Sequence, residues 1–183
     1  MKKKIIFIPG WMDTVENLVN WPGLDIWKEK IDINQKIDAE YIVGYSTGAN
    51  WALLNWKKNK NSKLILTMPL APKRKISNWF LRWIKHEIFE RSKITKKRSR
   101  CFPYIFRGII NLIKLMQVDP LPIIDEIPKD DLIIIRGKND NHFFDNEAAE
   151  IIKEKKIQLI ELGKVGHNWN EKIFLEIEKI VNG

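Results

Sequence analysis

The sequence contains a single cysteine, Cys101, among 183 residues. One cysteine excludes an internal disulfide and a cysteine-rich metal site, and it fits a cytoplasmic protein. Long apolar runs are also absent, because even the stretch 105–116 contains Arg107 and Lys114, so no segment has the length of a membrane span. The apolar run after the N-terminal lysines ends at Pro9-Gly10 and is too short for a signal peptide. We therefore expect one soluble, cytoplasmic domain that comprises residues 1–183.

Short runs rich in β-branched residues alternate with longer segments of helical pattern, which is typical of a parallel sheet covered by helices. Five strands are expected, at Lys4–Ile8, Glu40–Val43, Lys63–Thr67, Asp131–Arg136 and Ile157–Leu162. Helices are expected within Leu24–Gln35 and at Thr47–Lys58, Asn146–Lys155 and Asn170–Val181. Asn146 and Asn170 occupy N-cap positions. The predicted fold class is α/β, with about five mainly parallel strands flanked by helices.

The segment from Pro72 to Gln117 interrupts this alternation. Apolar side chains recur there at helical spacing in two stretches, 76–88 and 105–116, and Pro103 suits the first turn of the second helix. The segment contains 13 lysines and arginines against two glutamates, a balance of +11 in a chain whose net charge is +9. We expect residues 72–117, with a basic turn at 96–100, to form a basic helical cap inserted between strands; this segment is called the cap below.

The most informative motif is Gly44-Tyr45-Ser46-Thr47-Gly48, which matches the Gly-x-Ser-x-Gly pattern of a nucleophile elbow. It lies between a predicted strand and a predicted helix, as that turn requires. Gly44 and Gly48 are needed because a β-carbon at either position would collide with neighbouring chain. The motif predicts that Ser46 is a nucleophile; the alternative is an ordinary strand-to-helix turn with a surface serine.

A serine hydroxyl needs a base to accept its proton and an acid to orient that base. His167 follows the last predicted strand, so we predict it to be the base. His86 is interpreted as a solvated polar residue of the first cap helix, and His142 is a weaker candidate base. Asp140, the first carboxylate after the fourth predicted strand, is the predicted acid. Its competitor Asp145 directly precedes a helix, where a carboxylate is favoured by the helix dipole.

Two backbone N–H groups are expected to stabilise a developing oxyanion. One belongs to Thr47, and the other to Trp11 in the turn that follows the first strand. The indole of Trp11 is also expected to line an acyl pocket, together with Trp79 and Trp83 of the cap, although core packing is the alternative for any tryptophan. Neither a metal nor an organic cofactor is predicted.

The order of nucleophile, acid and histidine, each after a successive strand, resembles the α/β-hydrolase superfamily over nearly the whole chain except the cap. That superfamily often has His-Gly-x in the oxyanion loop, where this chain has Pro9-Gly10-Trp11; an amide donor does not need the histidine. The Gly-Trp pair and the elbow also resemble carboxylesterases that demethylate pimeloyl-acyl carrier protein. Ser46 lies only 34 positions after Met12, which leaves too few residues for a helix, a strand and a second helix. The resemblance therefore implies a reduced fold, in which the first strand becomes a sheet edge.

These residues predict a serine hydrolase that cleaves carboxylic esters or thioesters through an acyl-enzyme. The alternatives are an esterase acting on acyl groups carried by an acidic carrier protein, and a non-catalytic binding module. The basic cap is solvated surface or attracts an acidic acyl carrier protein or an anionic membrane surface; nucleic acid is ranked last, because no recognised binding motif accompanies the charge. We expect a monomer, or a dimer formed by pairing of two sheet edges.

Overall fold

A computed structural model describes residues 3–11, 13–28, 36–89 and 102–183. Its five strands form one parallel sheet in sequential order: β1 (Ile5–Ile8), β2 (Tyr41–Tyr45), β3 (Lys63–Thr67), β4 (Leu132–Gly137) and β5 (Gln158–Leu162). Each predicted strand is present, with ends within two residues of the prediction. The five-stranded α/β fold class is therefore confirmed.

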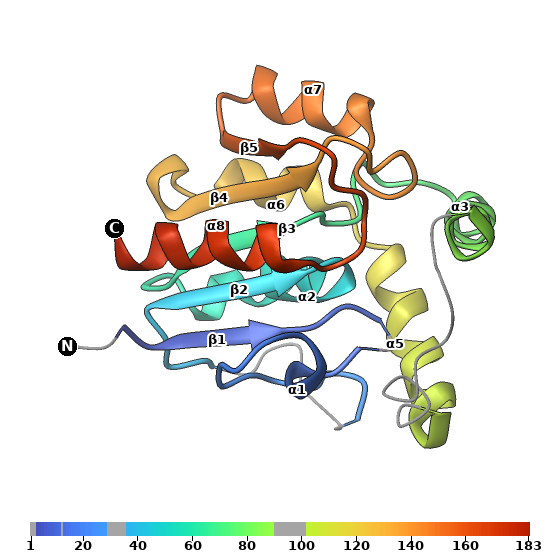
Figure 1. The fold of residues 1–183 in the computed structure, drawn as a ribbon, viewed down its shortest axis with the longest axis horizontal. Coiled ribbons are helices and arrows are strands. Elements are labelled where there is room, and N and C mark those ends of the chain that lie inside the picture. The colour runs from blue at the N-terminus through green and yellow to red at the C-terminus, as the bar shows by residue number, and fades with distance from the viewer. Residues whose placement is uncertain (1–2, 12, 29–35, 90–101) are drawn as a thin grey trace.

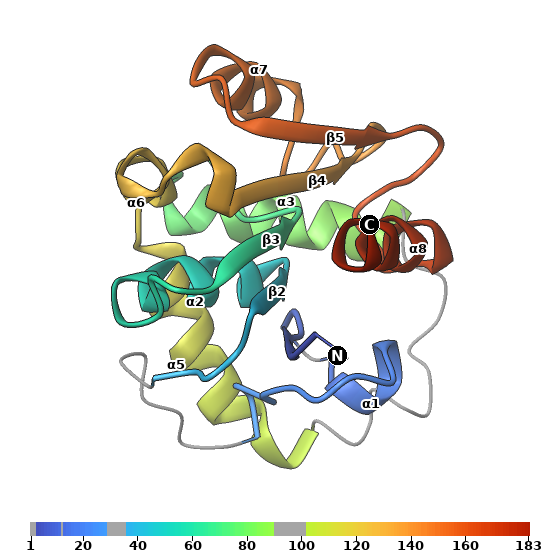
Figure 2. The same ribbon diagram turned by 90° about the vertical axis from the view of Figure 1, so that its left-hand side faces the viewer.

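Helices cover both faces of this sheet (Figures 1 and 2). α1 (Val15–Leu18) and α8 (Glu171–Asn182) lie on one face, and α2 (Thr47–Asn55) and α6 (Pro120–Glu126) lie on the other. α7 (Asn146–Glu154) precedes β5, and short 3-10 turns occupy 56–58, 102–104 and 129–131. None of the helices in the described part of the chain is long and apolar enough to cross a bilayer.

Two details of the predicted helices need correction, and a third is confirmed. Residues 24–28 form a turn rather than the start of a helix, and the rest of the predicted helix Leu24–Gln35 lies outside the described residues. Asp145, not Asn146, is the N-cap of α7, because its carboxylate accepts the N–H of Ala148 while the Asn146 amide oxygen accepts from Arg136. Asn170 caps α8 as predicted, by accepting the N–H groups of the residues two and three positions on.

Two further helices, α1 and α6, are absent from the prediction. α6 has a recognisable start, since Asp119 accepts the N–H of Leu121 and Pro120 occupies the first turn. Both helices are short, four and seven residues. Apolar periodicity is weak over so few residues, so their composition alone does not identify them.

The cap contains the two expected helices, α3 (Ile76–Phe89) and α5 (Ile105–Met116), near the edge of the sheet where the strands end (Figure 1). Pro103 lies in the 3-10 turn just before α5 rather than in its first turn. The predicted basic turn at 96–100 lies outside the described residues. The cap packs against the rest of the protein through a small apolar cluster, in which Trp79 and Met116 of the cap contact Leu70 and Phe143.

Ion pairs also join the start of the cap to the loop before α7. Arg74 and Arg82 both bond the carboxylate of Asp145 at 2.8 Å, and Arg82 also donates to the carbonyl oxygen of His142. Asp145 therefore serves as an anchor for the cap as well as an N-cap. Because this carboxylate is largely buried, the pairs are less screened by salt than surface pairs are.

β1 lies at an edge of the sheet, as expected. Its outward-facing backbone is partly occupied, because Phe7 N–H donates to the carbonyl oxygen of Pro22 and Leu24 N–H donates to the carbonyl oxygen of Phe7, both at 2.9 Å. Gly23 sits between these bonds, where a β-carbon would lie 2.4 Å from the Phe7 oxygen. These bonds occupy the outward-facing N–H and C=O groups of Phe7, and a dimer formed through this edge stays a prediction.

Candidate active site

Ser46 occupies a strained turn between β2 and α2. Its φ of 53° and ψ of −121° lie outside the regions that a serine usually adopts, at a cost of about 1–3 kcal/mol. Ser46 N–H donates to the carbonyl oxygen of Thr67 at 2.8 Å, which fixes the turn to β3. β-Carbons at Gly44 and Gly48 would lie 2.5 Å from the Ala49 Cα and 2.3 Å from the Ile8 oxygen. Glycine is therefore required at both positions, as the elbow motif predicted.

Three side chains from separate loops form a continuous hydrogen-bonded chain. The Nε2 of His167 lies 2.9 Å from the Oγ of Ser46, and its Nδ1 lies 2.7 Å from the Oδ2 of Asp140. Asp140 follows β4 and His167 follows β5, so the parallel strands deliver all three groups to the same edge of the sheet. The structure brings together the three residues that the sequence selected.

Asp140 is fully buried, with 0% of its surface exposed. Burial by itself would raise the pKa of this carboxyl, but the charge and hydrogen bond of His167 and the backbone N–H groups of Phe143 and His142 outweigh it and lower the pKa to about 2. Asp140 is therefore ionised at neutral pH and can only accept. His167 must then donate through Nδ1, which leaves Nε2 free to accept the proton of Ser46.

The hydroxyl of Tyr45 holds the loop that contains His167. It donates to the carbonyl oxygen of His167 at 3.0 Å and accepts the N–H of Trp169 at 3.2 Å. In the elbow motif, Tyr45 is the variable residue between Gly44 and Ser46. No signal in the sequence identifies this role, because the contact joins residues 122 positions apart.

His86 lies in the site, and its interpretation as a solvated residue is wrong. Only 3% of its surface is exposed, and its ring centre lies 5.5 Å from that of His167 and 5.4 Å from that of Phe143. Burial, together with the nearby His167, lowers the pKa of His86 to about 4, so it is neutral at pH 7. Its spacing of seven residues from Trp79 and three from Trp83 places it on the buried face of α3, which is the signal that could have found it.

The two competing candidates have other roles. His142 gives its backbone N–H to Asp140, and its ring lies against His86 rather than Ser46. Asp145 caps α7 and pairs with the cap arginines. Neither side chain takes part in the hydrogen-bonded chain from Ser46 to Asp140.

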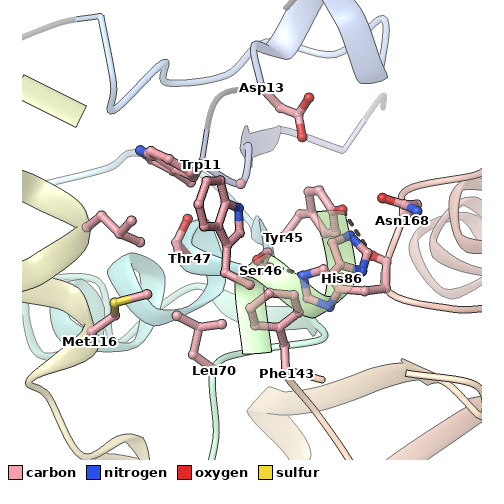
Figure 3. Close-up of a pocket in the computed structure, with 14 residues that line it drawn as sticks. Trp11, Asp13, Tyr45, Ser46, Thr47, Leu70, His86, Met116, Phe143 and Asn168 are labelled. Atoms are coloured by element: carbon pink, nitrogen blue, oxygen red, sulfur yellow. Dashed lines mark hydrogen bonds between the residues drawn. The ribbon is translucent and has the colours of Figure 1, made fainter. Parts of the chain in front are cut away.

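A cavity of about 50 Å³ opens beside Ser46 (Figure 3). Its apolar walls come from the cap and from the sheet edge: Trp11, Leu70, Trp83, Leu112, Met116 and Phe143. Trp11 and Trp83 meet edge to face with ring centres 5.3 Å apart, as a shared wall. Trp79 does not line the cavity, contrary to the prediction, because it is 1% exposed and stacks behind the wall on Phe143.

The two predicted oxyanion donors border this cavity. Thr47 begins α2 directly after Ser46, and Trp11 follows Gly10, whose β-carbon position lies 3.1 Å from the Cβ of Ser46. The turn that contains Trp11 therefore packs against the serine. Within the described residues, the hydroxyl of Thr47 is buried without a hydrogen-bond partner. The described residues contain no group of three or more His, Cys, Asp or Glu side chains that could hold a metal ion.

Comparisons with known proteins identify the architecture. No protein-family model matches the sequence, and no curated protein sequence is significantly similar to it. Solved structures do match: a lipase-esterase related protein from Clostridium acetobutylicum has 15% identity and a TM-score of 0.64, with 97% of this chain and 93% of that chain covered. A carboxylesterase from Nitrososphaera gargenis has 11% identity and a TM-score of 0.58, with 99% and 91% covered.

A third match is an α/β-hydrolase enzyme from a lagoon-sediment metagenome of Mar Chica, Morocco, with 16% identity, a TM-score of 0.53, and 100% of this chain and 90% of that chain covered. At identities this low, the similarities concern the fold and not the activity.

Proposed function

Because this chain has the α/β-hydrolase fold, we propose that it is a serine hydrolase that cleaves carboxylic esters or thioesters through an acyl-enzyme. The observation that carries the proposal is the hydrogen-bonded chain from Ser46 through His167 to a buried, ionised Asp140, at the mouth of an apolar cavity. The strained turn supports it, because a serine is held at positive φ only where the surroundings impose that conformation.

In the first step, the Oγ of Ser46 attacks the carbonyl carbon of the ester while the Nε2 of His167 takes the hydroxyl proton. Asp140 keeps Nδ1–H pointing toward itself and stabilises the imidazolium that forms. The carbonyl oxygen becomes an oxyanion, which the backbone N–H groups of Thr47 and Trp11 stabilise by a few kcal/mol each. Collapse of this intermediate expels the alcohol or thiol, which takes its proton from His167.

In the second step, a water molecule gives its proton to His167 and attacks the acyl group on Ser46. When the second tetrahedral intermediate collapses, His167 returns this proton to the Oγ of Ser46, and the products are the carboxylic acid and the free serine. A cavity of about 50 Å³ has room for only a few water molecules, so short acyl groups fit it best. The apolar walls suit a hydrocarbon acyl group rather than a charged one.

The test is hydrolysis of p-nitrophenyl esters from two to twelve carbons, with rates highest at the short end. Ser46→Ala should abolish turnover, whereas Ser77→Ala, which alters an exposed serine of α3, should leave it unchanged. A fluorophosphonate probe should label the wild type and Ser77→Ala but not Ser46→Ala, because only an activated serine reacts. A wild-type protein that neither turns over any ester nor reacts with the probe would refute the proposal.

A further inference from the structure

The cap exposes most of the large apolar side chains that the described part of the chain leaves in solvent. Nine of the ten exposed ones belong to the cap: Ile76, Phe80, Leu81, Ile88, Tyr104, Phe106, Ile109, Ile110 and Ile113. Phe106 is 81% exposed. Scattered exposed apolar residues are ordinary, but their concentration on one segment marks an interaction surface.

Both cap helices are apolar on two faces. α3 buries Trp79 and His86 toward the site. Its exposed apolar residues recur at helical spacing on another face: Ile76, Phe80, Leu81 and Ile88. α5 buries Gly108, Leu115 and Met116, and exposes apolar residues at 106, 109, 110 and 113. A helix that simply covers a site has a polar outer face, so the outer faces of α3 and α5 need a partner.

Cations border these outer faces. Lys85 of α3 and both Arg107 and Lys114 of α5 are exposed, and helical spacing places each beside the apolar stripe of its own helix. Lys73 and Lys75 are exposed just before α3. An apolar stripe flanked by lysine and arginine is typical of helices that lie in the surface of an anionic bilayer.

We propose that the outer faces of α3 and α5 bind an anionic membrane surface. The apolar side chains insert at the boundary between headgroups and acyl chains, and the flanking cations bind lipid phosphate and carboxylate groups. A second copy of the chain suits these faces less well, because it would bring together two caps that each have a charge balance of +11. An acidic protein would match the charge, but bulky aliphatic and aromatic side chains on two helices match hydrocarbon better.

Membrane docking would place the cavity close to the lipid. The inner faces of the same helices supply four of its wall residues: Trp83 and His86 from α3, and Leu112 and Met116 from α5. The cap therefore has its outer side chains toward the bilayer and its inner side chains toward Ser46.

Cosedimentation with phosphatidylcholine vesicles, and with vesicles that also contain phosphatidylserine, tests the proposal. The wild type should prefer the anionic vesicles, and salt should weaken the binding. Each cation near an anionic surface strengthens binding about fivefold, so Lys85→Glu/Lys114→Glu should weaken it about 30-fold or more. Phe106→Ser/Ile110→Ser should weaken it about tenfold or more, through lost insertion. Circular dichroism checks that each variant is folded.

Matched controls lie outside the cap. Lys58→Glu/Lys129→Glu changes the net charge by the same amount at exposed residues near the opposite ends of the strands, and Leu175→Ser alters the tenth exposed apolar residue, on α8. Both should bind within about twofold of the wild type.

Full binding by the cap variants, or equal losses in the controls, would overturn the proposal. So would absence of vesicle binding together with a stable complex with an acidic acyl carrier protein, which would assign the cap to a protein partner. The readout is binding and is independent of whether Ser46 is catalytic.

Discussion

Asp140→Asn tests how the carboxylate directs the tautomer of His167. Oδ1 of Asp140 accepts the N–H groups of His142 and Phe143, and Oδ2 accepts the N–H of Phe144 and the ring Nδ1–H of His167. An asparagine has only one acceptor oxygen. The N–H groups of His142 and Phe143 both require an acceptor, so this oxygen should take the position of Oδ1. Its NH₂ group then faces His167, whose Nδ1 must become an acceptor. The ring proton moves to Nε2, so His167 can no longer accept the proton of Ser46.

The expected loss is large in activity and moderate in stability. A histidine locked in the wrong tautomer lowers kcat about 10⁴-fold in triads of this type. The N–H of Phe144 also loses its acceptor in a buried position, which costs about 1–3 kcal/mol of folding stability. The assay is kcat/KM for p-nitrophenyl acetate near neutral pH, together with urea unfolding of both proteins.

Asp145→Asn is the matched control, because it makes the same chemical change five residues away. The variant loses a charge that pairs with Arg74 and Arg82 but keeps an oxygen that can cap α7. Its activity should stay within about tenfold of the wild type, since Asp145 does not contact His167. If Asp140→Asn lost less than about tenfold, or if Asp145→Asn lost as much as Asp140→Asn, the assignment of the acid would be wrong.

Three further predictions follow from the site. Gly48→Ala should destabilise the protein by about 3 kcal/mol or more, because the new β-carbon would collide with the backbone oxygens of Ile8 and Pro9. Gly163→Ala is the control: its β-carbon would have no atom within 4 Å, so stability should change by less than about 0.5 kcal/mol. Urea unfolding measures both variants. His86→Gln should lower kcat/KM by no more than about tenfold and His167→Gln by at least about 10³-fold, because only His167 contacts Ser46; equal losses would contradict this. The pKa of Asp140 in the folded protein is about 2, below its usual 3.8, so ionised Asp140 should contribute about 2 kcal/mol to folding stability above pH 4. This contribution is lost as the pH falls toward 2. The folding stabilities of the wild type and Asp140→Asn should therefore converge between pH 4 and pH 2, and parallel curves would refute the prediction.

The strands along the chain and the central site residues could be predicted from the sequence because they depend on local rules. Runs such as Leu64–Leu66 and Ile133–Ile135 are continuous β-branched or aliphatic segments, which indicates strands buried on both faces. Parallel strands bring the loops after them to one edge, so Ser46, Asp140 and His167 could be assigned together. The glycines of the elbow follow from steric rules that apply to any chain.

The packing of the cap could not be predicted, because it depends on which face of α3 meets the sheet. Periodicity defines a stripe through Trp79, Trp83 and His86 but does not say which of the three reaches the cavity. In the folded protein Trp79 lies behind the wall, while Trp83 and His86 line the cavity. A polar residue such as His86 was read as solvated because its neighbours in sequence, Lys85 and Glu87, are charged.

Long-range polar contacts were also decided only by the tertiary structure. Asp145 was expected to act at a helix start, and it does, but its pairs with Arg74 and Arg82 join residues more than 60 positions apart. Two other contacts also join distant segments and cannot be read from composition. Tyr45 hydrogen-bonds the loop that contains His167, and Pro22 and Leu24 hydrogen-bond Phe7 of β1. Local sequence determined the strands, the longer helices and the chemistry at the ends of the strands, because steric and hydrophobic rules act between near neighbours. The shape of the cavity and the exposed faces of the cap were decided by tertiary packing, because they depend on how separate elements meet.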